Sequence, residues 1–397
     1  MNRPNAARVA IVAAVRTPIG KFLGSLSEVT AVDLAVAAAR GAIARSGLEP
    51  GDFGETIFGQ ARQAGSAPNP GRQVSVKAGL PVAVPASTIN QACASGLRAI
   101  QLGVQSIRAG EAEAVLAGGV ESMSRVPFLL EGLRKGWKMG HQPLVDNMYR
   151  DGFTCGLCGK IMGETAETLA GQYAIPREEQ DAYAVRSQNR AEAARNAGRF
   201  QDEIVPVEVP GRGGVTVVDT DEHIRDGATP ADLAKLPPVF AKTGTVTAGN
   251  ASGITDGAAA LVLASEDLVR RKGLDVLAWY EAGTVVGVEP AIMGIGPVPA
   301  VRALLEKTGT QLADHDLVEL NEAFAAQVLA VDRDLKLDPE RLNVNGGSIA
   351  LGHPIGASGA RIVVTLLHEM RRRNVARGLA TLCVSGGLGI ASTFRRD

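Results

Sequence analysis

TINQACASGLRAI, at residues 88–100, and NGGSIALGHPIGASGA, at residues 345–360, are the two stretches that decide the fold. Each joins a strand-like run to an apolar-faced helix through a turn, and each holds a serine followed by glycine, Ser95 in the first stretch and Ser358 in the second. Because each half of such a chain can bury one face of a sheet under its own helices, the repeat predicts a duplicated α/β architecture. The alternative is that similar strand and helix units recur, as they do in many α/β sequences, without any duplication.

The segments around these stretches alternate between strand-like and helix-like patterns. In the first part we expect strands at 7–15, 85–90 and 112–120 and helices at 33–47 and 95–110, with Asp33 as the N-cap of the earlier helix. In the last part we expect strands at 278–288, 317–324 and 378–387 and helices at 297–309, after 324 to about 335, and at 357–370. In each part, the strand that follows the Ser-Gly helix ends in a Gly-Gly pair. The pair begins at Gly118 in the first part and at Gly386 in the second, where we expect this strand to be the last one.

The chain has 397 residues, which is long enough for two domains that each have a core. We expect one half to comprise residues 1–122 with about 254–275, and the other half to comprise 276–397. Residues 123–253 are polar, are interrupted by glycine and proline, and show a clear helix only from about 163 to 197. We interpret them as a loop domain inserted into the first half, with a role in binding or assembly, because long excursions usually carry such roles.

The composition excludes several classes of protein. With 41 Lys and Arg against 42 Asp and Glu, the formal net charge is −1, so no overall charge draws the chain toward nucleic acid or a membrane surface. The four cysteines, Cys93, Cys155, Cys158 and Cys383, are too few for a disulfide framework and indicate free thiols in a reducing compartment. The apolar run at the N-terminus is too short to span a membrane and lacks a cleavage site, so we expect a cytoplasmic protein.

Cys93 is a candidate nucleophile because it lies between a strand and the start of a helix. Backbone N–H groups and the helix dipole at that position favour an anion, and therefore a thiolate. His353 lies in the glycine-dense turn that corresponds to Cys93 in the second half. If the halves pack about a pseudo-twofold axis, the two turns face one cleft and the imidazole can act as the base. The structural alternatives are a buried cysteine and a turn that only the glycines shape.

Two further candidates stand at the ends of strands in the second half. Cys383 would point toward the same cleft, where a second thiol could move a carbon-bound proton, although a core cysteine is the alternative. Asn321 can position a water or donate to an oxyanion, and its alternative is a plain N-cap. The pair Cys155 and Cys158 has no further ligands at suitable spacing, so we expect no metal, and no G-x-G-x-x-G turn indicates a bound dinucleotide.

Taken together, these segments resemble the thiolase family over nearly the whole chain. The stretches that carry the resemblance, in family order, are AVRTPIGKFLGSL, NQACASGLRAI, AGGVESMS, GTVTAGNASGITDGAAA, ELNEAFAAQ, NVNGGSIALGHPIGASGARI and CVSGGLG. The resemblance implies the thiolase fold, in which two βαβαβαββ halves pack as five αβαβα layers with an inserted loop domain. It also implies a reversible reaction in which acyl-CoA and acetyl-CoA give 3-oxoacyl-CoA and CoA.

The resemblance also assigns roles to the candidate residues. Cys93 would accept the acyl group, His353 would activate Cys93, and Cys383 would remove or return the α-proton of the second acyl-CoA. Asn321 would hold a water that forms one oxyanion hole together with His353. The backbone N–H groups of Cys93 and Ser385 would form the other oxyanion hole, because fixed donors stabilise a developing negative charge.

By the same resemblance, coenzyme A would lie along the inserted segment. Its thioesters would be the substrates, and no metal or redox cofactor is implied. The residues implied in binding are Arg225 near the nucleotide, Ser252 near the pantetheine, and Met162, Phe240, Ala248 and Phe324 along the tunnel. Members of the family are dimers or tetramers, so we expect a homo-oligomer.

Two positions depart from the family pattern. Ile161 stands where acetoacetyl-type members commonly have histidine, and Ser385 stands where many relatives have glycine. We favour an acetyl-CoA C-acetyltransferase, and Ile161 leaves open a degradative 3-ketoacyl-CoA thiolase of broader chain length. A ketoacyl-carrier-protein synthase would lack Cys383 in its present context. The remaining alternative is an inactive CoA-binding protein of the same fold.

Overall fold

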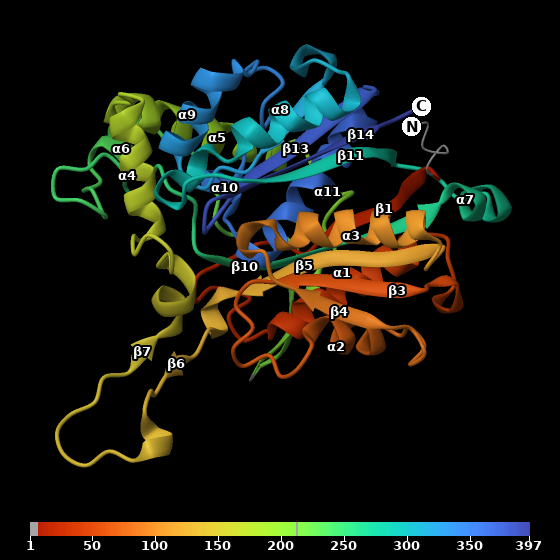
Figure 1. Ribbon diagram of the computed structural model, residues 1–397, viewed down its shortest axis with the longest axis horizontal. Helices are drawn as coiled ribbons and strands as arrows, with labels where there is room; N and C mark the ends of the chain where they lie inside the picture. The colour runs from red at the N-terminus through yellow and green to blue at the C-terminus, as the bar shows by residue number, and fades with distance from the viewer. Residues whose placement is uncertain (1–6, 212) are drawn as a thin grey trace.

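The computed structural model of the chain describes residues 7–211 and 213–397, and Figure 1 labels its elements. The strands are β1 Val9–Arg16, β2 Gly20–Lys21, β3 Glu55–Gln60, β4 Ala86–Ile89, β5 Ala114–Ser122, β6 Phe128–Leu129, β7 Val145–Asp146, β8 Val207–Gly211, β9 Gly214–Val218, β10 Thr255–Ser265, β11 Ala278–Gly287, β12 Leu317–Leu320, β13 Arg377–Val384 and β14 Leu388–Arg395. The α-helices are α1 Ala31–Arg45, α2 Pro70–Lys77, α3 Ser95–Ala109, α4 Met162–Gln172, α5 Arg177–Asn196, α6 Pro230–Ala234, α7 Glu266–Lys272, α8 Pro297–Thr308, α9 Ala325–Leu335, α10 Ser348–Leu351 and α11 Ile355–Arg373.

The two halves of the chain build sheets of the same topology. In the first half the strands lie in the order β4-β3-β5-β10-β1, and in the second half they lie in the order β12-β13-β14-β11. β3 is parallel to β4 and β5, β12 is parallel to β13, and the remaining neighbours are antiparallel. The third strand of the second half is reduced to one bridge between Val318 and Leu342, after which Asn343 adopts a φ of +45°. With that one reduction, both halves follow the predicted βαβαβαββ order.

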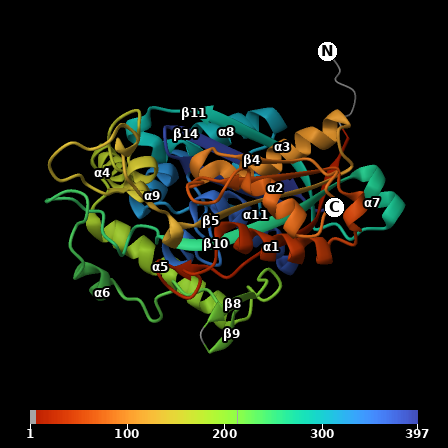
Figure 2. The ribbon, with the colours of Figure 1, turned by 90° about the horizontal axis from the view of Figure 1, so that it is seen from below.

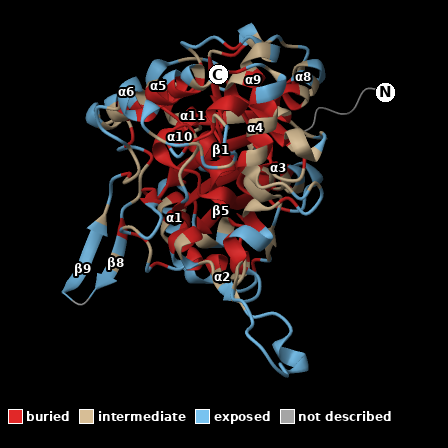
Figure 3. Ribbon diagram, turned by 90° about the vertical axis from the view of Figure 1, so that its left-hand side faces the viewer, coloured by how far each residue is buried: buried red, intermediate tan, exposed pale blue. Residues whose placement is uncertain are grey.

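Five layers stack through the molecule, and they can be followed in Figures 1 and 2. Helices α1 and α2 cover the outer face of the first sheet, α8 and α9 cover that of the second sheet, and α3 and α11 lie between the sheets. The two sheets join edge to edge where residues 9–11 of β1 pair antiparallel with β11. Three large clusters of buried apolar residues fill the spaces between the layers, and the ribbon in Figure 3 is red, the colour of buried residues, through the interior. The predicted five-layer fold is confirmed.

The repeated Ser-Gly pairs mark the place where the two central helices touch. A Cβ atom on Gly96 would lie 2.7 Å from the backbone nitrogen of Ala360, and a Cβ atom on Gly359 would lie 2.6 Å from that of Leu97. Because no side chain fits in such a gap, glycine is required at both positions. The first turns of α3 and α11, and the loops that precede them, are therefore held next to each other.

Three local predictions are wrong. Thr30, and not Asp33, caps α1, because the Thr30 hydroxyl accepts a hydrogen bond from the backbone N–H of Asp33 at 3.1 Å. β13 is not the last strand, since a turn at Gly386, with a φ of +88°, returns the chain as β14. Gly118 does not match Gly386, because it lies inside β5, where the ring of Phe58 packs against its backbone.

The inserted segment contains two helices where we predicted one from 163 to 197. Ala174 adopts a φ of +48° and Pro176 caps the second helix, so α4 and α5 are separate. β6 and β7 pair at the base of an exposed arm that leaves the body at the lower left of Figure 1. After the insertion, β10 returns between β1 and β5, which supports the proposal that 254–275 belongs to the first half. None of the helices in the described part of the chain combines the length and the apolar character needed to cross a bilayer.

Candidate active site

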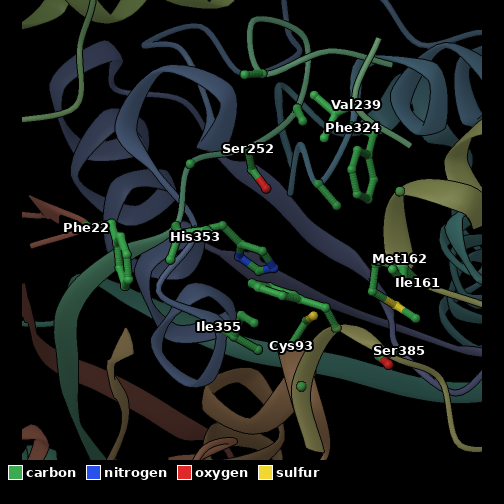
Figure 4. A pocket seen from close by; sticks show the side chains of 18 of the residues that line it. Phe22, Cys93, Ile161, Met162, Val239, Ser252, Phe324, His353, Ile355 and Ser385 are labelled. Atoms are coloured by element: carbon green, nitrogen blue, oxygen red, sulfur yellow. The ribbon is translucent and has the colours of Figure 1, made fainter. Parts of the chain in front are cut away.

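One cavity of about 590 Å³ gathers nearly all of the predicted site residues. Cys93, His353, Cys383 and Ser385 line it together, and Figure 4 shows the His353 ring and the Cys93 sulfur turned toward the same space. The predicted CoA-binding residues line the same cavity: Arg225, Ser252, Met162, Phe240, Ala248 and Phe324. Asn321 does not line the cavity but lies buried at the end of β12, just before residues 323–324, which do.

Cys93 lies in a strained turn between β4 and α3. Ala92 has a φ of +45°, a conformation that residues with side chains rarely adopt. The hydroxyl of Ser95 holds this turn, since it accepts from the Gln91 N–H at 2.9 Å and donates to the Ala92 carbonyl at 2.7 Å. The turn leaves Cys93 half-buried, with its side chain on the wall of the cavity.

The protonation state of Cys93 differs from the one that we expected. Burial raises the pKa of the thiol, and this effect exceeds the lowering of the pKa by the backbone N–H of Ser385 and by the charge of Arg62. The prediction of a thiolate at rest is therefore wrong for the unliganded site, because desolvation outweighs the stabilisation of an anion at a helix N-terminus. Cys93 is a neutral thiol at rest and needs a base to become a nucleophile.

His353 is held in the orientation and the tautomer that suit a base. Its Nδ1 lies 2.6 Å from the Oγ of Ser358, and that hydroxyl donates its only hydrogen to the carbonyl of Pro354 at 3.0 Å. Ser358 must therefore accept from Nδ1–H, which leaves a lone pair on Nε2. Burial, together with the charges of Arg361 and Arg62, lowers the pKa of His353 to about 3. The imidazole is thus neutral and able to accept a proton.

Cys383 is a second neutral thiol, at the end of β13. It is buried in an apolar cluster that includes Met293 and Phe324, with Met162 and Phe240 packed against it. Burial raises the pKa of Cys383 well above its ordinary value, and the neighbouring Cys93 raises it further. A thiol in such a place keeps its proton at rest, and its thiolate, once formed, is a strong base.

A chain of hydrogen bonds orients the side chain of Asn321. Nη2 of Arg361 donates to the Oγ of Ser348 at 3.0 Å, and a guanidinium can only donate. The Ser348 hydroxyl hydrogen is therefore free to be donated to Asn321, whose Oδ1 accepts it at 2.6 Å. Nδ2 of Asn321 is left as a buried donor that has no hydrogen-bond partner among the described residues.

The family follows from comparison with known proteins. Residues 9–267 match the family model of the thiolase N-terminal domain, and residues 274–396 match that of the thiolase C-terminal domain. The chain belongs to the thiolase family. The two models together cover both halves and the inserted segment, so the resemblance seen in the sequence is confirmed.

Individual relatives agree with this assignment. Acetyl-CoA acetyltransferase of Pseudomonas aeruginosa is 54% identical over 390 residues, which cover 98% of this chain and 99% of that protein. Acetyl-CoA acetyltransferase of Chromobacterium violaceum is 53% identical over 389 residues, with coverage of 98% and 99%. The structure of the Bacillus anthracis acetyl-CoA acetyltransferase matches with a TM-score of 0.97 at 47% identity, covering 99% of this chain and 100% of that one. Human mitochondrial 3-ketoacyl-CoA thiolase in complex with CoA matches with a TM-score of 0.95 at 45% identity, with coverage of 99% and 98%.

In this thiolase the inserted segment is tied to the two loops of the second half that contain Ala323 and His353. The backbone N–H of Ser252 donates to the carbonyl of Ala323 at 3.0 Å, and the backbone N–H of His353 donates to the carbonyl of Gly253 at 3.0 Å. The segment that we expected to hold pantetheine therefore borders the imidazole directly. The backbone of residues 252–253 and the backbone of His353 are therefore linked directly.

The remaining CoA-binding candidates form two parts of the thiolase cavity. Phe240 and Phe324 meet edge to face, with ring centroids 6.2 Å apart, and make one wall apolar. Arg225 lies among more polar residues, and its Nη2 donates to the carbonyl of Ala248 at 3.0 Å. Ile161, the departure from the family pattern, lines the same cavity.

Sequence reasoning gave no role to Ser358 or to two buried charges beside the thiolase cavity, Arg62 and Glu121. Glu121 accepts hydrogen bonds from the backbone N–H groups of Ala61, Arg62 and Gly356 at 3.0–3.1 Å, and burial raises its pKa to about 7. It thereby ties the end of β3 to the start of α11. Glu121 could have been found from the sequence, because an acidic residue at the end of an apolar strand, as in AGGVES, is unusual. Arg62 could not, because it lies in a stretch without any local pattern.

Cys155 and Cys158 are not among the residues that line the thiolase cavity. They lie in a turn that is closed by an isolated bridge between Thr154 and Ile161, and Cys155 is the more deeply buried of the two. Within residues 7–211 and 213–397, no group of three or more His, Cys, Asp and Glu side chains is arranged to hold a metal ion. The turn places Ile161, and neither cysteine, in the wall of the cavity.

Proposed function

We propose that this thiolase catalyses reversible acyl transfer and Claisen condensation, in which acyl-CoA and acetyl-CoA give 3-oxoacyl-CoA and CoA through an acyl group on Cys93. The observation that carries the proposal is the convergence of Cys93, Cys383 and a neutral His353 on one cavity. Acetyl-CoA C-acetyltransferase activity is the favoured form, and the names of the relatives support it.

In the first half of the reaction, the sulfur of Cys93 attacks the thioester carbonyl while Nε2 of His353 takes the thiol proton. The backbone N–H groups of Cys93 and Ser385 stabilise the negative charge on the carbonyl oxygen. When the bond to the CoA sulfur breaks, Cys383 gives its proton to the departing thiolate. The site then holds an acylated Cys93, a protonated His353 and a Cys383 thiolate.

In the second half, the Cys383 thiolate takes the α-proton of acetyl-CoA. Protonated His353 and a water bound to Nδ2 of Asn321 hold the enolate oxygen, which is costly to form in bulk water. The enolate carbon attacks the acyl carbon, the bond to the Cys93 sulfur breaks, and the Cys93 thiolate recovers its proton from His353. All three groups return to the neutral state from which they began. The raised pKa of Cys383 supports its role, because a thiolate in an apolar site is a strong base.

Two measurements test the proposed reaction. Radiolabelled acetyl-CoA should leave one acetyl group per chain on Cys93, and acetoacetyl-CoA should be cleaved when CoA is added. If the protein binds CoA but cleaves no 3-oxoacyl-CoA of any length, the inactive CoA-binding alternative is correct and the proposed reaction is wrong.

A second candidate is a degradative 3-ketoacyl-CoA thiolase of broader chain length, with a role in fatty-acid metabolism. Ile161 favours it, because a branched apolar side chain replaces an imidazole in the wall beside Met162. The likeness to human mitochondrial 3-ketoacyl-CoA thiolase supports it as well. A series of 3-oxoacyl-CoA substrates ranked by kcat/KM separates the two candidates, because a C-acetyltransferase loses activity beyond four carbons and the degradative enzyme does not.

We also propose that the protein is a homo-oligomer, a dimer or a tetramer. The support lies in the arm between residues 128 and 145, whose large apolar side chains are exposed to solvent. Four of these side chains are more than half exposed in the chain taken alone: Phe128, Leu133, Met139 and Leu144. Exposed apolar side chains at this density mark interaction sites. Light scattering combined with gel filtration measures the mass, and a mass of 41.2 kDa, that of one chain, would contradict the proposal.

The three-part division of the chain and the cytoplasmic location remain proposals. The division assigns residues 1–122 and about 254–275 to the first half, 123–253 to the loop domain and 276–397 to the second half. The place of β10 between β1 and β5 supports it. The cytoplasmic location is supported by four cysteines that are all free thiols, which suits a reducing compartment.

A further inference from the structure

Arg62 brings a positive charge into the cavity at the end where Cys93 lies. It follows the last residue of β3, it is 8% exposed, and it lines the cavity together with Cys93 and Gly152. Its guanidinium lies against the backbone of Gly152, where an added Cβ atom would be 2.7 Å from Nε and 3.1 Å from Nη2. The charged end of the side chain is thus beside the reacting sulfur and not out in solvent.

The guanidinium of Arg62 has no partner within the described residues. Its backbone groups are used, since the N–H donates to Glu121 at 3.0 Å and the carbonyl accepts from Gln60 at 2.9 Å. Its side-chain nitrogens donate to no described residue, and Nε is fully buried without a partner. No described carboxylate oxygen lies within the 4.0 Å of an ion pair. An arginine that is buried with idle donors costs several kcal/mol of desolvation, so it is rarely kept without a ligand.

Glu121 compensates part of the positive charge of Arg62 but accepts no hydrogen bond from the Arg62 guanidinium. Its carboxylate oxygens already accept three backbone N–H groups, and it interacts with Arg62 through space, at a distance longer than an ion pair. The other lysine and arginine side chains that line the cavity each have a partner. Lys21 lies 3.6 Å from a carboxylate oxygen of Glu222, and Arg225 donates to a backbone carbonyl. Among the described lysines and arginines of this cavity, Arg62 is the one whose side chain has no partner.

The surroundings of Arg62 indicate what kind of ligand. Cys93 and Phe153 both pack against the apolar cluster that contains Ile355, and all three line the cavity, so an acyl group on the sulfur meets apolar walls first. The guanidinium lies next to these walls and presents a planar fork of donors. Such a fork matches a carboxylate, which it can bind through two parallel hydrogen bonds.

We propose that Arg62 binds a carboxylate at the far end of the acyl chain, so that the substrates include 3-oxoacyl-CoA thioesters of dicarboxylic acids. The proposal rests on the proposed thiolase reaction and specifies its substrate class. Cleavage of such a substrate by CoA gives acetyl-CoA and a shorter dicarboxylic acyl-CoA, through the same bond changes at Cys93. The methylene groups of the chain contact the apolar walls, and the terminal carboxylate neutralises Arg62.

The experiment compares two substrates that differ only in the terminal group, 3-oxohexanoyl-CoA and 3-oxohexanedioyl-CoA. In the wild-type enzyme we expect kcat/KM for the dicarboxylic substrate to exceed that for the neutral one by about tenfold or more, the effect of a charge-assisted bidentate pair. Arg62→Met, which keeps the length and removes the donors, should lower the ratio of kcat/KM for the dicarboxylic substrate to that for the neutral one by about a hundredfold. Arg62→Lys should lie between them, because it keeps the charge without the fork.

Arg125→Met is the matched control, since Arg125 is a partly exposed arginine near the start of the insertion and does not line the cavity. It should leave both substrates unchanged. The proposal is overturned if the wild-type enzyme treats the two substrates alike or prefers the neutral one, a result that needs no variant to fold. It is also overturned if Arg62→Met lowers both substrates equally and moves the pH profile of kcat/KM, because Arg62 would then act only on Cys93.

Failure of the proposed reaction gives a different pattern. In that case acetoacetyl-CoA and both longer substrates would remain uncleaved. The substrate class is then tested by calorimetric binding of succinyl-CoA against butyryl-CoA, which have the same number of acyl carbons. Tighter binding of succinyl-CoA by the wild-type protein, lost in Arg62→Met, supports the role of Arg62, and equal binding overturns it.

Discussion

The loop that carries Cys93 and the loop that carries His353 are copies of one unit that have been put to different uses. Each precedes a central helix, and each uses a serine at the start of that helix. In the first half Ser95 bonds only to the backbone, at Gln91 and Ala92, and so holds the turn that presents Cys93. In the second half Ser358 bonds to the side chain of His353 and so selects its tautomer.

In a duplicated scaffold, serine at equivalent positions can therefore perform two different tasks. The serine of the first half stabilises a strained backbone, and the serine of the second half controls where a proton sits. Loss of the first should reduce the stability of the fold, whereas loss of the second should reduce the rate of the reaction.

Removing either sulfur separates the two half-reactions. Cys93→Ala should take up no label from acetyl-CoA and lose more than about a thousandfold in kcat, because no other group can carry the acyl chain. Cys383→Ala should still be labelled on Cys93 but should fail to condense. Labelling by radiolabelled acetyl-CoA and the rate of acetoacetyl-CoA cleavage measure the two steps. Cys158→Ala, outside the cavity, serves as the control, and stoichiometric labelling of Cys93→Ala would remove Cys93 from the nucleophile role.

Ser358→Ala should lower kcat by about a hundredfold, because the imidazole loses the acceptor that keeps its proton on Nδ1. The melting temperature should fall only slightly. Ser95→Ala is the matched variant from the other half, and it should cost about 1–3 kcal/mol of unfolding free energy through two lost hydrogen bonds while kcat of the folded fraction falls much less. Thermal unfolding and steady-state kinetics on both variants give the comparison. Equal losses of kcat in the two variants would show that the serines have the same role.

Ser348→Ala should lower the rate of condensation by about tenfold, because the Asn321 amide is then free to turn over and present its oxygen in place of Nδ2. Labelling of Cys93 should remain normal, since the first half-reaction does not need Asn321. Ser392→Ala also removes a buried hydroxyl, one that accepts from Gln101 and lies outside the cavity, and it should change neither step. A Ser348→Ala enzyme that condenses at the wild-type rate would contradict the assigned orientation.

The pKa of His353 predicts how stability depends on pH. The folded state holds this pKa at about 3, well below its ordinary value, so between about pH 6.5 and 3 the unfolded chain binds a proton that the folded chain does not. The contribution of the neutral imidazole is therefore complete above about pH 6.5 and is lost as the pH falls, by up to about 1.4 kcal/mol per pH unit. Denaturant unfolding from pH 7 to 4 should show a smaller slope in His353→Asn. An unchanged slope would mean that His353 is protonated in the folded state.

Glu121 should produce a dependence of opposite sign. Its folded pKa of about 7 lies above its ordinary value, so its contribution is complete below about pH 4.5 and is lost as the pH rises toward 7. Because the two contributions oppose each other between about pH 4.5 and 6.5, the stability of Glu121→Gln should rise more steeply with pH over this interval than that of the wild type. The contributions of these two buried groups therefore partly cancel each other in the wild-type protein. Only the single variants reveal the two contributions.

The architecture could be predicted from the sequence because the repeated Ser-Gly pairs reflect a helix–helix contact that packing requires. The glycines after Ser95 and Ser358 recur because the central helices touch there, and the same repeat placed Cys93 and His353 at equivalent turns. Finer features depended on choices that a local pattern does not contain. Thr30 and Asp33 are both good caps, and which one is used depends on where the helix meets the sheet.

The parts of the site that escaped prediction are those that depend on burial. Cys93 seemed suited to be a thiolate from its place before a helix, and only the packing around it shows that desolvation dominates. That the Arg62 guanidinium has no hydrogen-bond partner among the described residues can be seen only in the folded structure. Ser358 was noted as a repeated residue, but its role required the direction of the His353 ring.

The close packing of α3 against α11, with Gly96 against Ala360 and Gly359 against Leu97, also sets a dimension of the enzyme. Since two backbones meet there without side chains between them, the spacing from nucleophile to base is determined by main-chain contact, and repacking of neighbouring side chains cannot adjust it. Evolution can therefore exchange the walls of the cavity for new acyl groups while the reacting atoms keep their separation. A single added methyl group at either glycine would push the two central helices apart. The reaction of every substrate would then slow, because the spacing of the reacting groups would change.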